Sequence, residues 1–348
     1  MSNIEQNRAI GRWLALWAAM VGLLVLIGGA TRLTESGLSI TEWQPVSGVI
    51  PPIGDAQWTE EFSKYQQIPQ YKLLNHAMSL GEFKTIFLWE YIHRLWARLL
   101  GVALGLPLLW FALRRRLPRE VWPRLLGLLV LLGLQGALGW WMVMSGLQER
   151  TSVSQYRLAA HLLTALALYA FTVWTAAELI EPRGTRAPDA DGNLSASLIA
   201  LALMVPFTAA SGAFVAGLKA GKIYNTFPLM GAGLVPPEYG QLAPFWKNFF
   251  ENPAAVQFNH RLIAAATFTL AIWVWFRARR SKNPRLVRAS RLVLAAALLQ
   301  VALGISTLLS GVPVALGVAH QAGAVLLLTA SLLALHSNGS VTSPFAGS

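Results

Sequence analysis

Long, continuous apolar stretches dominate the chain, and short polar segments separate them. Eight stretches reach the length of about 20 residues that a helix needs to cross the hydrocarbon layer of a membrane. They span residues 13–30, 86–111, 125–144, 156–177, 198–218, 254–276, 292–309 and 313–335. The stretches are too long and too evenly apolar to be the alternating strands of a membrane barrel. The pattern predicts an all-α integral membrane protein with eight transmembrane helices.

Composition supports the membrane assignment. Of the 348 residues, 55% are hydrophobic and 13% are charged, whereas soluble domains carry roughly 25% charged residues. The net charge of +12 would suggest nucleic acid on a soluble surface, but here apolar runs separate the basic residues, so no nucleic-acid partner is expected. The chain has no cysteine, which excludes disulfides, Cys-ligated zinc, iron–sulfur clusters and thiol catalysis.

The distribution of Lys and Arg predicts the orientation. With the N-terminus inside, the inner segments hold 16 of the 28 basic residues and six acidic ones, and the outer segments hold nine of each. Cytoplasmic segments of membrane proteins carry such an excess of positive charge. Both termini are therefore expected in the cytoplasm. The two long outer segments, 31–85 and 219–253, are rich in Gly, Pro and Trp and are expected to cap the helices.

The two halves of the chain resemble each other. The tripeptide at 93–95, His-Arg-Leu, recurs at 260–262. Five residues of the first half recur with identical spacing, namely Gln135, Leu138, Gly139, Ser145 and Gly146 as Gln300, Leu303, Gly304, Ser310 and Gly311. Because each unit has four spans, both units enter the membrane from the same side. We predict two tandem parallel four-helix repeats, 1–190 and 191–348, a relation opposite to that of inverted-repeat transporters.

Four of the six histidines lie in predicted spans, at similar depth below the outer boundary: His93, His161, His260 and His320. Each could be an interhelical hydrogen-bond partner. Two imidazoles from facing helices also make a six-coordinate haem site, so two repeats predict two haem-sized sites. Zinc is disfavoured, because each half supplies only two histidines. The other two histidines, His76 and His336, are expected to be solvated.

Glu90 breaks the symmetry of the halves. It lies three residues before His93, on the same helix face, whereas the equivalent position in the second half is Gln257. A carboxylate there can act as acid, base or cation stabiliser, or as an ion-pair partner of Arg94 or Arg98. Arg94 and Arg261 directly follow two of the histidines, and haem propionates, a structural ion pair or snorkelling to the membrane surface would each suit them.

These motifs resemble the haem A synthase family. The stretch GGATRLTESGLS at 28–39, with Trp43 and Pro45, is similar to its first-loop signature, EYIHR at 90–94 to its E-x-x-H-R motif, and YNTFP at 224–228 to its second-half loop signature. The resemblance extends over nearly the whole chain. It implies an eight-helix oxidoreductase that converts the C8 methyl of haem O to the formyl of haem A, with water as the oxygen source, for cytochrome oxidase.

The resemblance also implies roles for the site residues. His260 and His320 would be axial ligands of a resident haem b, while His93 and His161 would hold the substrate haem. Glu90 would be the essential carboxylate, and Arg94 and Arg261 are the candidate arginines for haem binding. Some relatives have a cysteine pair in an outer loop. This cysteine-free chain is similar to the proteobacterial and mitochondrial branch.

The resemblance places the protein in a bacterial inner membrane, with the haem sites towards the periplasm. Haem O is the expected substrate, and contact with haem O synthase, the farnesyltransferase that makes it, follows from the order of the two reactions. The sequence leaves the electron acceptor and the formation of a homo-oligomer open. The main alternative is a di-haem membrane cytochrome of the quinol or ferric reductase type, and a transporter is the non-enzyme alternative.

Overall fold

The computed structural model describes residues 3–45, 47–114, 117–148, 150–182 and 192–339. The proposed boundary between the repeats, at 190/191, lies outside these residues. So do six of the charged residues assigned to the inner segments: Arg115, Arg116, Arg183, Arg186, Asp189 and Asp191.

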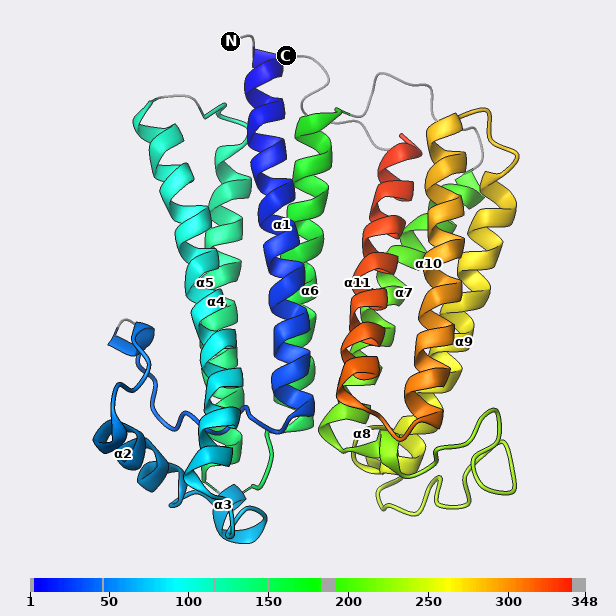
Figure 1. Cartoon of the computed structure of the whole chain (residues 1–348). Coiled ribbons are helices and arrows are strands. Elements are labelled where there is room, and N and C mark those ends of the chain that lie inside the picture. Colours follow the sequence, from blue (N-terminus) through cyan, green and yellow to red (C-terminus); the bar gives the residue numbers. More distant parts are fainter. Residues whose placement is uncertain (1–2, 46, 115–116, 149, 183–191, 340–348) are drawn as a thin grey trace.

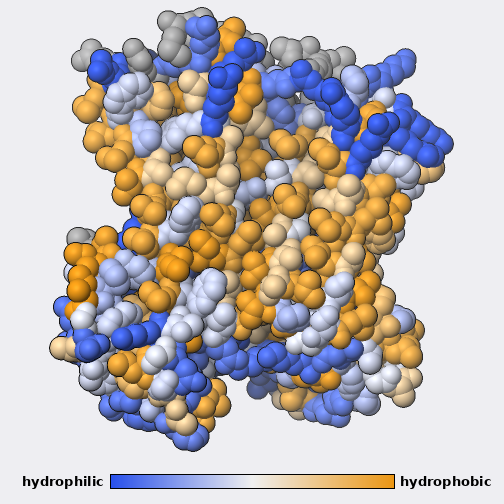
Figure 2. Space-filling model, viewed as in Figure 1, coloured by the Kyte–Doolittle hydropathy of each residue, from blue (hydrophilic) through white to orange (hydrophobic). Residues whose placement is uncertain are grey.

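Eight long helices run through the described residues, which confirms the predicted fold class. They are α1 (Asn3–Leu33), α4 (Leu80–Leu113), α5 (Trp122–Leu147), α6 (Gln155–Ile180), α7 (Gly192–Gly217), α9 (Pro253–Ala278), α10 (Pro284–Leu309) and α11 (Val314–Ser337). All eight are long and apolar enough to cross a membrane. In Figure 2, hydrophobic residues cover the middle of the visible face, and hydrophilic residues gather at its two ends.

The helices extend beyond the predicted spans because polar residues start them. Ser79 and Glu82 form a capping box that starts α4 at Leu80, six residues earlier than hydropathy indicates. Asn252 accepts hydrogen bonds from the first amides of α9, and Asn283 does the same for α10. A hydropathy window does not register these caps, so it places the starts too late.

Each half of the chain forms a ring of four helices (Figure 1). In the first ring, α1 and α5 each pack on both α4 and α6; in the second, α7 and α10 each pack on both α9 and α11. The two rings meet where α1 and α6 pack on α11, and where α6 packs on α7. Consequently α4 lies across the first ring from α6, and α9 lies across the second ring from α11.

Tryptophan side chains fix the register between α1 and α4. The indole nitrogens of Trp13 and Trp17 donate to the carbonyls of Ala103 and Leu100, and that of Trp96 donates to the carbonyl of Met20, at 2.9–3.0 Å. Buried indole N–H groups need such acceptors. This antiparallel register places the outer end of α1 opposite the outer third of α4.

Short helices fold over the end of the rings opposite the termini (Figure 1). The first outer segment contains η1 (Ser47–Val49), α2 (Asp55–Tyr65) and α3 (Pro69–Leu73); the second contains η2 (Ala220–Lys222), η3 (Phe245–Lys247) and α8 (Asn248–Glu251). A separate buried cluster joins the first segment to α4, to α5 and to the turn before α6 through Leu38, Tyr65, Ile68, Phe83, Phe87, Val143 and Val153. The first outer segment is therefore an ordered cap.

Candidate functional site

Each of the four membrane histidines packs edge-on against a glycine of a neighbouring helix. An ideal Cβ atom added to the glycine would lie about as close to the imidazole Cε1 in every case: 3.0 Å for Gly28 and His93, 3.1 Å for Gly139 and His161, 3.2 Å for Gly212 and His260, and 2.8 Å for Gly304 and His320. Three of these distances are tighter than most real Cβ contacts, and the one at Gly304 is shorter than real Cβ atoms show. The absence of a side chain at each glycine therefore leaves room for the ring.

The histidine contacts match between the halves. Gly28 and Gly212 are 184 positions apart, as are Ser36 and Ala220 in the loops that follow. His93 lies on α4 and packs on α1, whereas His161 lies on α6 and packs on α5. Because α4 and α6 face each other across the first ring, the two imidazoles come from opposite sides of it. His260 on α9 and His320 on α11 likewise come from opposite sides of the second ring. The members of each pair are close enough to interact electrostatically.

The imidazole nitrogens differ in their surroundings. Nδ1 is fully enclosed in His93, His161 and His320 and has no hydrogen-bond partner among the described residues. In His260 it lies 2.8 Å from Oγ of Ser211. All four histidines nevertheless keep partial exposure, and none of the four Nε2 atoms is among the enclosed, unpartnered atoms of the described residues. Nε2 is therefore the nitrogen available to a ligand.

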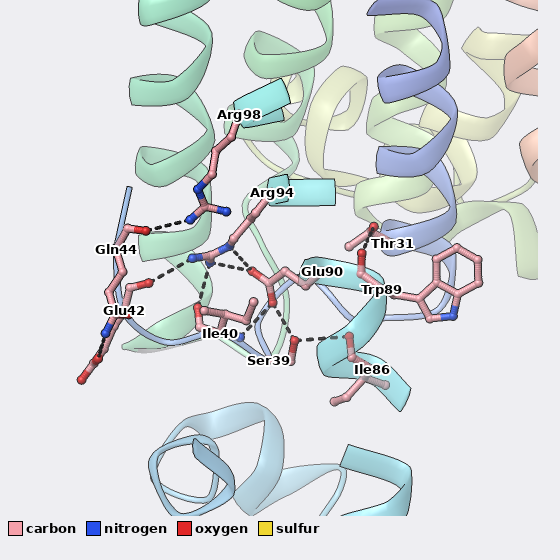
Figure 3. A network of polar contacts seen from close by, with 10 residues as sticks. All are labelled: Thr31, Ser39, Ile40, Glu42, Gln44, Ile86, Trp89, Glu90, Arg94 and Arg98. Atoms are coloured by element: carbon pink, nitrogen blue, oxygen red, sulfur yellow. Dashed lines mark hydrogen bonds and ion pairs between the residues drawn. The ribbon is translucent and has the colours of Figure 1, made fainter. Parts of the chain in front are cut away.

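Glu90 is 3% exposed and fully hydrogen-bonded (Figure 3). Its Oε2 accepts from the hydroxyl of Ser39 at 2.7 Å and from the amide of Ile40 at 2.9 Å. Its Oε1 accepts from Nε and Nη2 of Arg94 at 3.1 and 2.6 Å. Four donors, two of them from one guanidinium, fix the position of the carboxylate.

Two arginines on the same helix attach the first loop to α4. Arg94 donates to the carbonyls of Ile40 and Glu42 at 2.8 and 3.0 Å, and Arg98 donates to those of Gln44 and Pro45 at 2.7 and 2.9 Å. Figure 3 shows both guanidinium groups turned towards the loop. The contacts of Arg94 therefore fit the structural ion pair, one of the roles that the sequence left open.

The second half has the same attachment without the carboxylate. Arg261 donates to the carbonyl of Tyr224 at 3.0 Å, 184 positions after Ile40. Gln257, at the position of Glu90, donates to the same carbonyl at 3.1 Å. The Tyr224 hydroxyl donates to Glu238, and this hydrogen bond raises the pKa of Tyr224. Arg261 thus also contacts a loop, and the position of Arg98 is taken by Ala265.

Removing the Arg98 guanidinium should loosen the first loop selectively. Charge-assisted hydrogen bonds contribute more than neutral ones, so Arg98→Ala is expected to accelerate hydrogen exchange at the amide of Gly48, which bonds Gln44, about 10- to 100-fold. Arg157→Ala is the matched control, because Arg157 donates to the carbonyl of Trp141 within α5. Equal exchange at Gly48 in both variants would show that Arg98 does not hold the loop.

One histidine prediction is wrong, and several site residues were not predicted. His76 is exposed, as expected, but the His336 side chain is only 11% exposed and lies 4.0 Å from the buried carboxylate of Glu178; its ring also meets Trp174. The helix continues past His336 to Ser337 and packs on α6, so the residue is enclosed between helices. The sequence interpretation gave no site role to Ser39, Ser211 or the contact glycines, although Gly139 and Gly304 belong to the repeat and Gly28 and Gly212 share the spacing of the loops that follow them.

Comparisons with known proteins agree with one another. The family model described as "Cytochrome oxidase assembly protein" matches residues 11–332. A protein of Parvibaculum lavamentivorans named "Heme A synthase" is 46% identical over 330 residues, which cover 95% of this chain and 94% of that protein. Proteins with the same name from Nitrosospira multiformis and Bradyrhizobium diazoefficiens are 48% and 49% identical, covering 95% and 94% of this chain and 93% and 91% of their own lengths.

Proposed function

The chain belongs to the family of cytochrome oxidase assembly proteins, and from this premise we propose that it is a haem A synthase. The enzyme would oxidise the C8 methyl group of haem O to the formyl group of haem A. Its similarity to proteins of that name over 95% of its length supports this function over a di-haem electron carrier or a transporter. The structural observation that carries the proposal is the pairing of imidazoles across each ring, with the buried carboxylate of Glu90 in the first ring and the amide of Gln257 at the equivalent place in the second.

The residues of the second ring fit a permanently bound haem b. His260 and His320 would hold its iron through Nε2, and the glycines beside them leave room for the rings. Ser211 meets Nδ1 of His260, and partners of this kind orient a ligand and increase its basicity. The position equivalent to Ser211 in the first half is Ile27, whose side chain has no polar group. Haem b at this site would supply one-electron transfer.

The first ring fits an exchangeable haem. His93 and His161 would hold haem O, and neither Nδ1 atom has a partner among the residues that the structure describes, whereas in the second ring His260 has Ser211 and His320 has none among those residues. A less firmly oriented ligand pair suits a substrate that must leave after reaction. Haem O and haem A would therefore bind and dissociate here, while the second ring keeps its haem.

Glu90 would act on the substrate carbon. Conversion of the methyl to a formyl group with water as the oxygen source releases four electrons and four protons. The carboxylate lies one helical turn from His93 towards the outer cap, and its four donors hold it in place. It would stabilise positive charge at the electron-poor carbon, or accept a proton from the attacking water. Arg94, Ser39 and Ile40 would be the residues that position it.

The orientation in the membrane follows from charge. The described basic residues at the start of α1 and between α9 and α10 lie at the end of the rings where both termini lie (Figure 1). By the excess of positive charge on cytoplasmic segments, this end would face the cytoplasm and the capped end the periplasm, in a bacterial inner membrane. Residues 1–190 would form the substrate half and residues 191–348 the resident-haem half. Haem O synthase would be the partner that delivers the substrate.

Analysis of bound pigments tests the function directly. Protein purified from cells that make haem O should contain b-type haem together with O- or A-type haem, as determined by the pyridine haemochrome spectrum and by chromatography of the extracted pigments. Cells that lack the protein should accumulate haem O and contain no haem A. Protein that carries only b-type haem, in cells whose haem A content does not depend on it, would identify an electron-transfer cytochrome instead.

A further inference from the structure

One side chain connects the two rings at the level of the histidines. Gln321 directly follows His320 on α11, and its amide nitrogen donates to the carbonyl of Val25 on α1 at 3.0 Å. Its Oε1 lies against Gly29, where an added Cβ would collide with it. The residue before Gly29 is Gly28, on which the ring of His93 packs. A short path of contacts therefore runs from His320 in the second ring to His93 in the first.

The seam between α1 and α11 is built for close approach. Gly317 packs on the side chain of Leu33, and Gly22 lies 3.6 Å, measured from an ideal Cβ, from Val325. Gln321 lies between these two contacts and fills the space that Gly29 leaves. Hydrogen bonds between membrane helices commonly fix such seams. Here the bond fixes a seam that has a proposed haem ligand immediately beside it.

The contact occurs on one side of the molecule only. His161 and His320 are 159 positions apart, so Leu162 is the equivalent of Gln321. Gly28 and Gly212 are 184 positions apart, so Ala213 is the equivalent of Gly29. Leu162 has no side-chain N–H to donate, and Ala213 carries a Cβ where Gly29 leaves space. The link therefore joins the proposed resident-haem ligand to the helix that supports the proposed substrate ligand, and the opposite seam lacks it.

We propose that Gln321 is a positioning residue for the reaction, which holds helix α11, and with it His320, in place against α1 and so fixes the spacing and orientation of the two haem sites. The inference rests on the proposed function, because it assigns His320 to the resident haem and His93 to the substrate. An electron that leaves the substrate site crosses this seam, and electron transfer between redox groups falls steeply with their separation. A residue that sets the seam therefore affects the reaction without touching either reacting group.

Two variants disturb the contact from opposite sides. Gln321→Met keeps the length of the side chain but removes the N–H donor, and Gly29→Ala forces the Gln321 side chain out of its place. Each should change the electron paramagnetic resonance g-values of the bound haem b, which report the orientation of its axial imidazoles. Each should also lower haem A formation about 2- to 30-fold while the content of haem b stays at one per proposed site.

The double variant and a matched control make the test specific. Gly29→Ala with Gln321→Ala removes the collision, so its effect should be smaller than the sum of the effects of Gly29→Ala and Gln321→Ala made singly. Tyr169→Phe removes another hydrogen bond between the rings, that between the hydroxyls of Tyr169 and Thr329 at 2.7 Å, away from the histidines, and should leave g-values and haem A formation unchanged. Unchanged g-values and full haem A formation in both single variants would overturn the inference. If the unmodified protein forms no haem A, the proposed function fails instead.

Discussion

Glu90→Gln is expected to reduce haem A formation by at least about 100-fold, because positioned acid–base groups contribute about 10²- to 10⁴-fold to reaction rates. The amide cannot accept a proton or stabilise positive charge as the carboxylate does. The variant should still bind haem b, since His260 and His320 lie in the other ring. The measurement is the ratio of haem A to haem O in membranes, with the haem b content of the purified protein as the internal reference.

The second half shows that an amide at this position is compatible with the fold. Gln257 occupies the equivalent place beside Arg261 and shares the Tyr224 carbonyl with it. The matched control is therefore Glu90→Gln combined with Gln257→Glu, which keeps one carboxylate in the protein but moves it to the other ring. It should remain inactive. If haem A formation survived in Glu90→Gln, or if the single variant lost protection of Gly48 from hydrogen exchange as Arg98→Ala should, Glu90 would serve to attach the loop.

The sequence predicts the membrane-spanning helices well because hydropathy measures the dominant free-energy term directly. Long apolar segments must form helices in a bilayer, where no water satisfies the backbone, so all eight appear within a few residues of their predicted ends or extend beyond them. The positions of the histidines on alternate helices follow from the same spans. Hydropathy does not detect the polar residues that start a helix: the capping box at Ser79 and Glu82 starts α4 six residues before the predicted apolar stretch.

The conformation of the first loop could not be derived in the same way. It depends on contacts between residues far apart in the chain, such as Arg98 with Gln44 and Glu90 with Ser39, and in each a side chain on α4 meets the loop. No local pattern fixes these pairs. The error at His336 has a related origin, since its burial depends on how α11 packs against α6 and on the carboxylate of Glu178 there. Interhelical packing of this kind is invisible to composition and periodicity.

The two histidine pairs should respond differently to replacement by alanine. In cells that make haem b but no haem O, His260→Ala and His320→Ala should each lower the bound haem b at least about tenfold, because losing a direct iron ligand costs no less than losing the group that orients one. His93→Ala and His161→Ala should retain it, because their ring would bind haem O. The measurement is the low-spin Soret absorbance per protein, with His76→Ala as the control for an exposed histidine outside the rings.

Restoring the missing ligand separates an effect on the iron from an effect on the fold. An alanine at 260 or 320 leaves a gap beside Gly212 or Gly304, into which free imidazole can diffuse and bind iron. Added imidazole should therefore recover the low-spin spectrum in these two variants and have no effect on His93→Ala. Loss of haem b in His93→Ala, together with its retention in His320→Ala, would show that the first ring holds the resident haem and the second ring the substrate. Glu90 would then lie beside the resident haem, and its proposed role on the substrate carbon would be untenable.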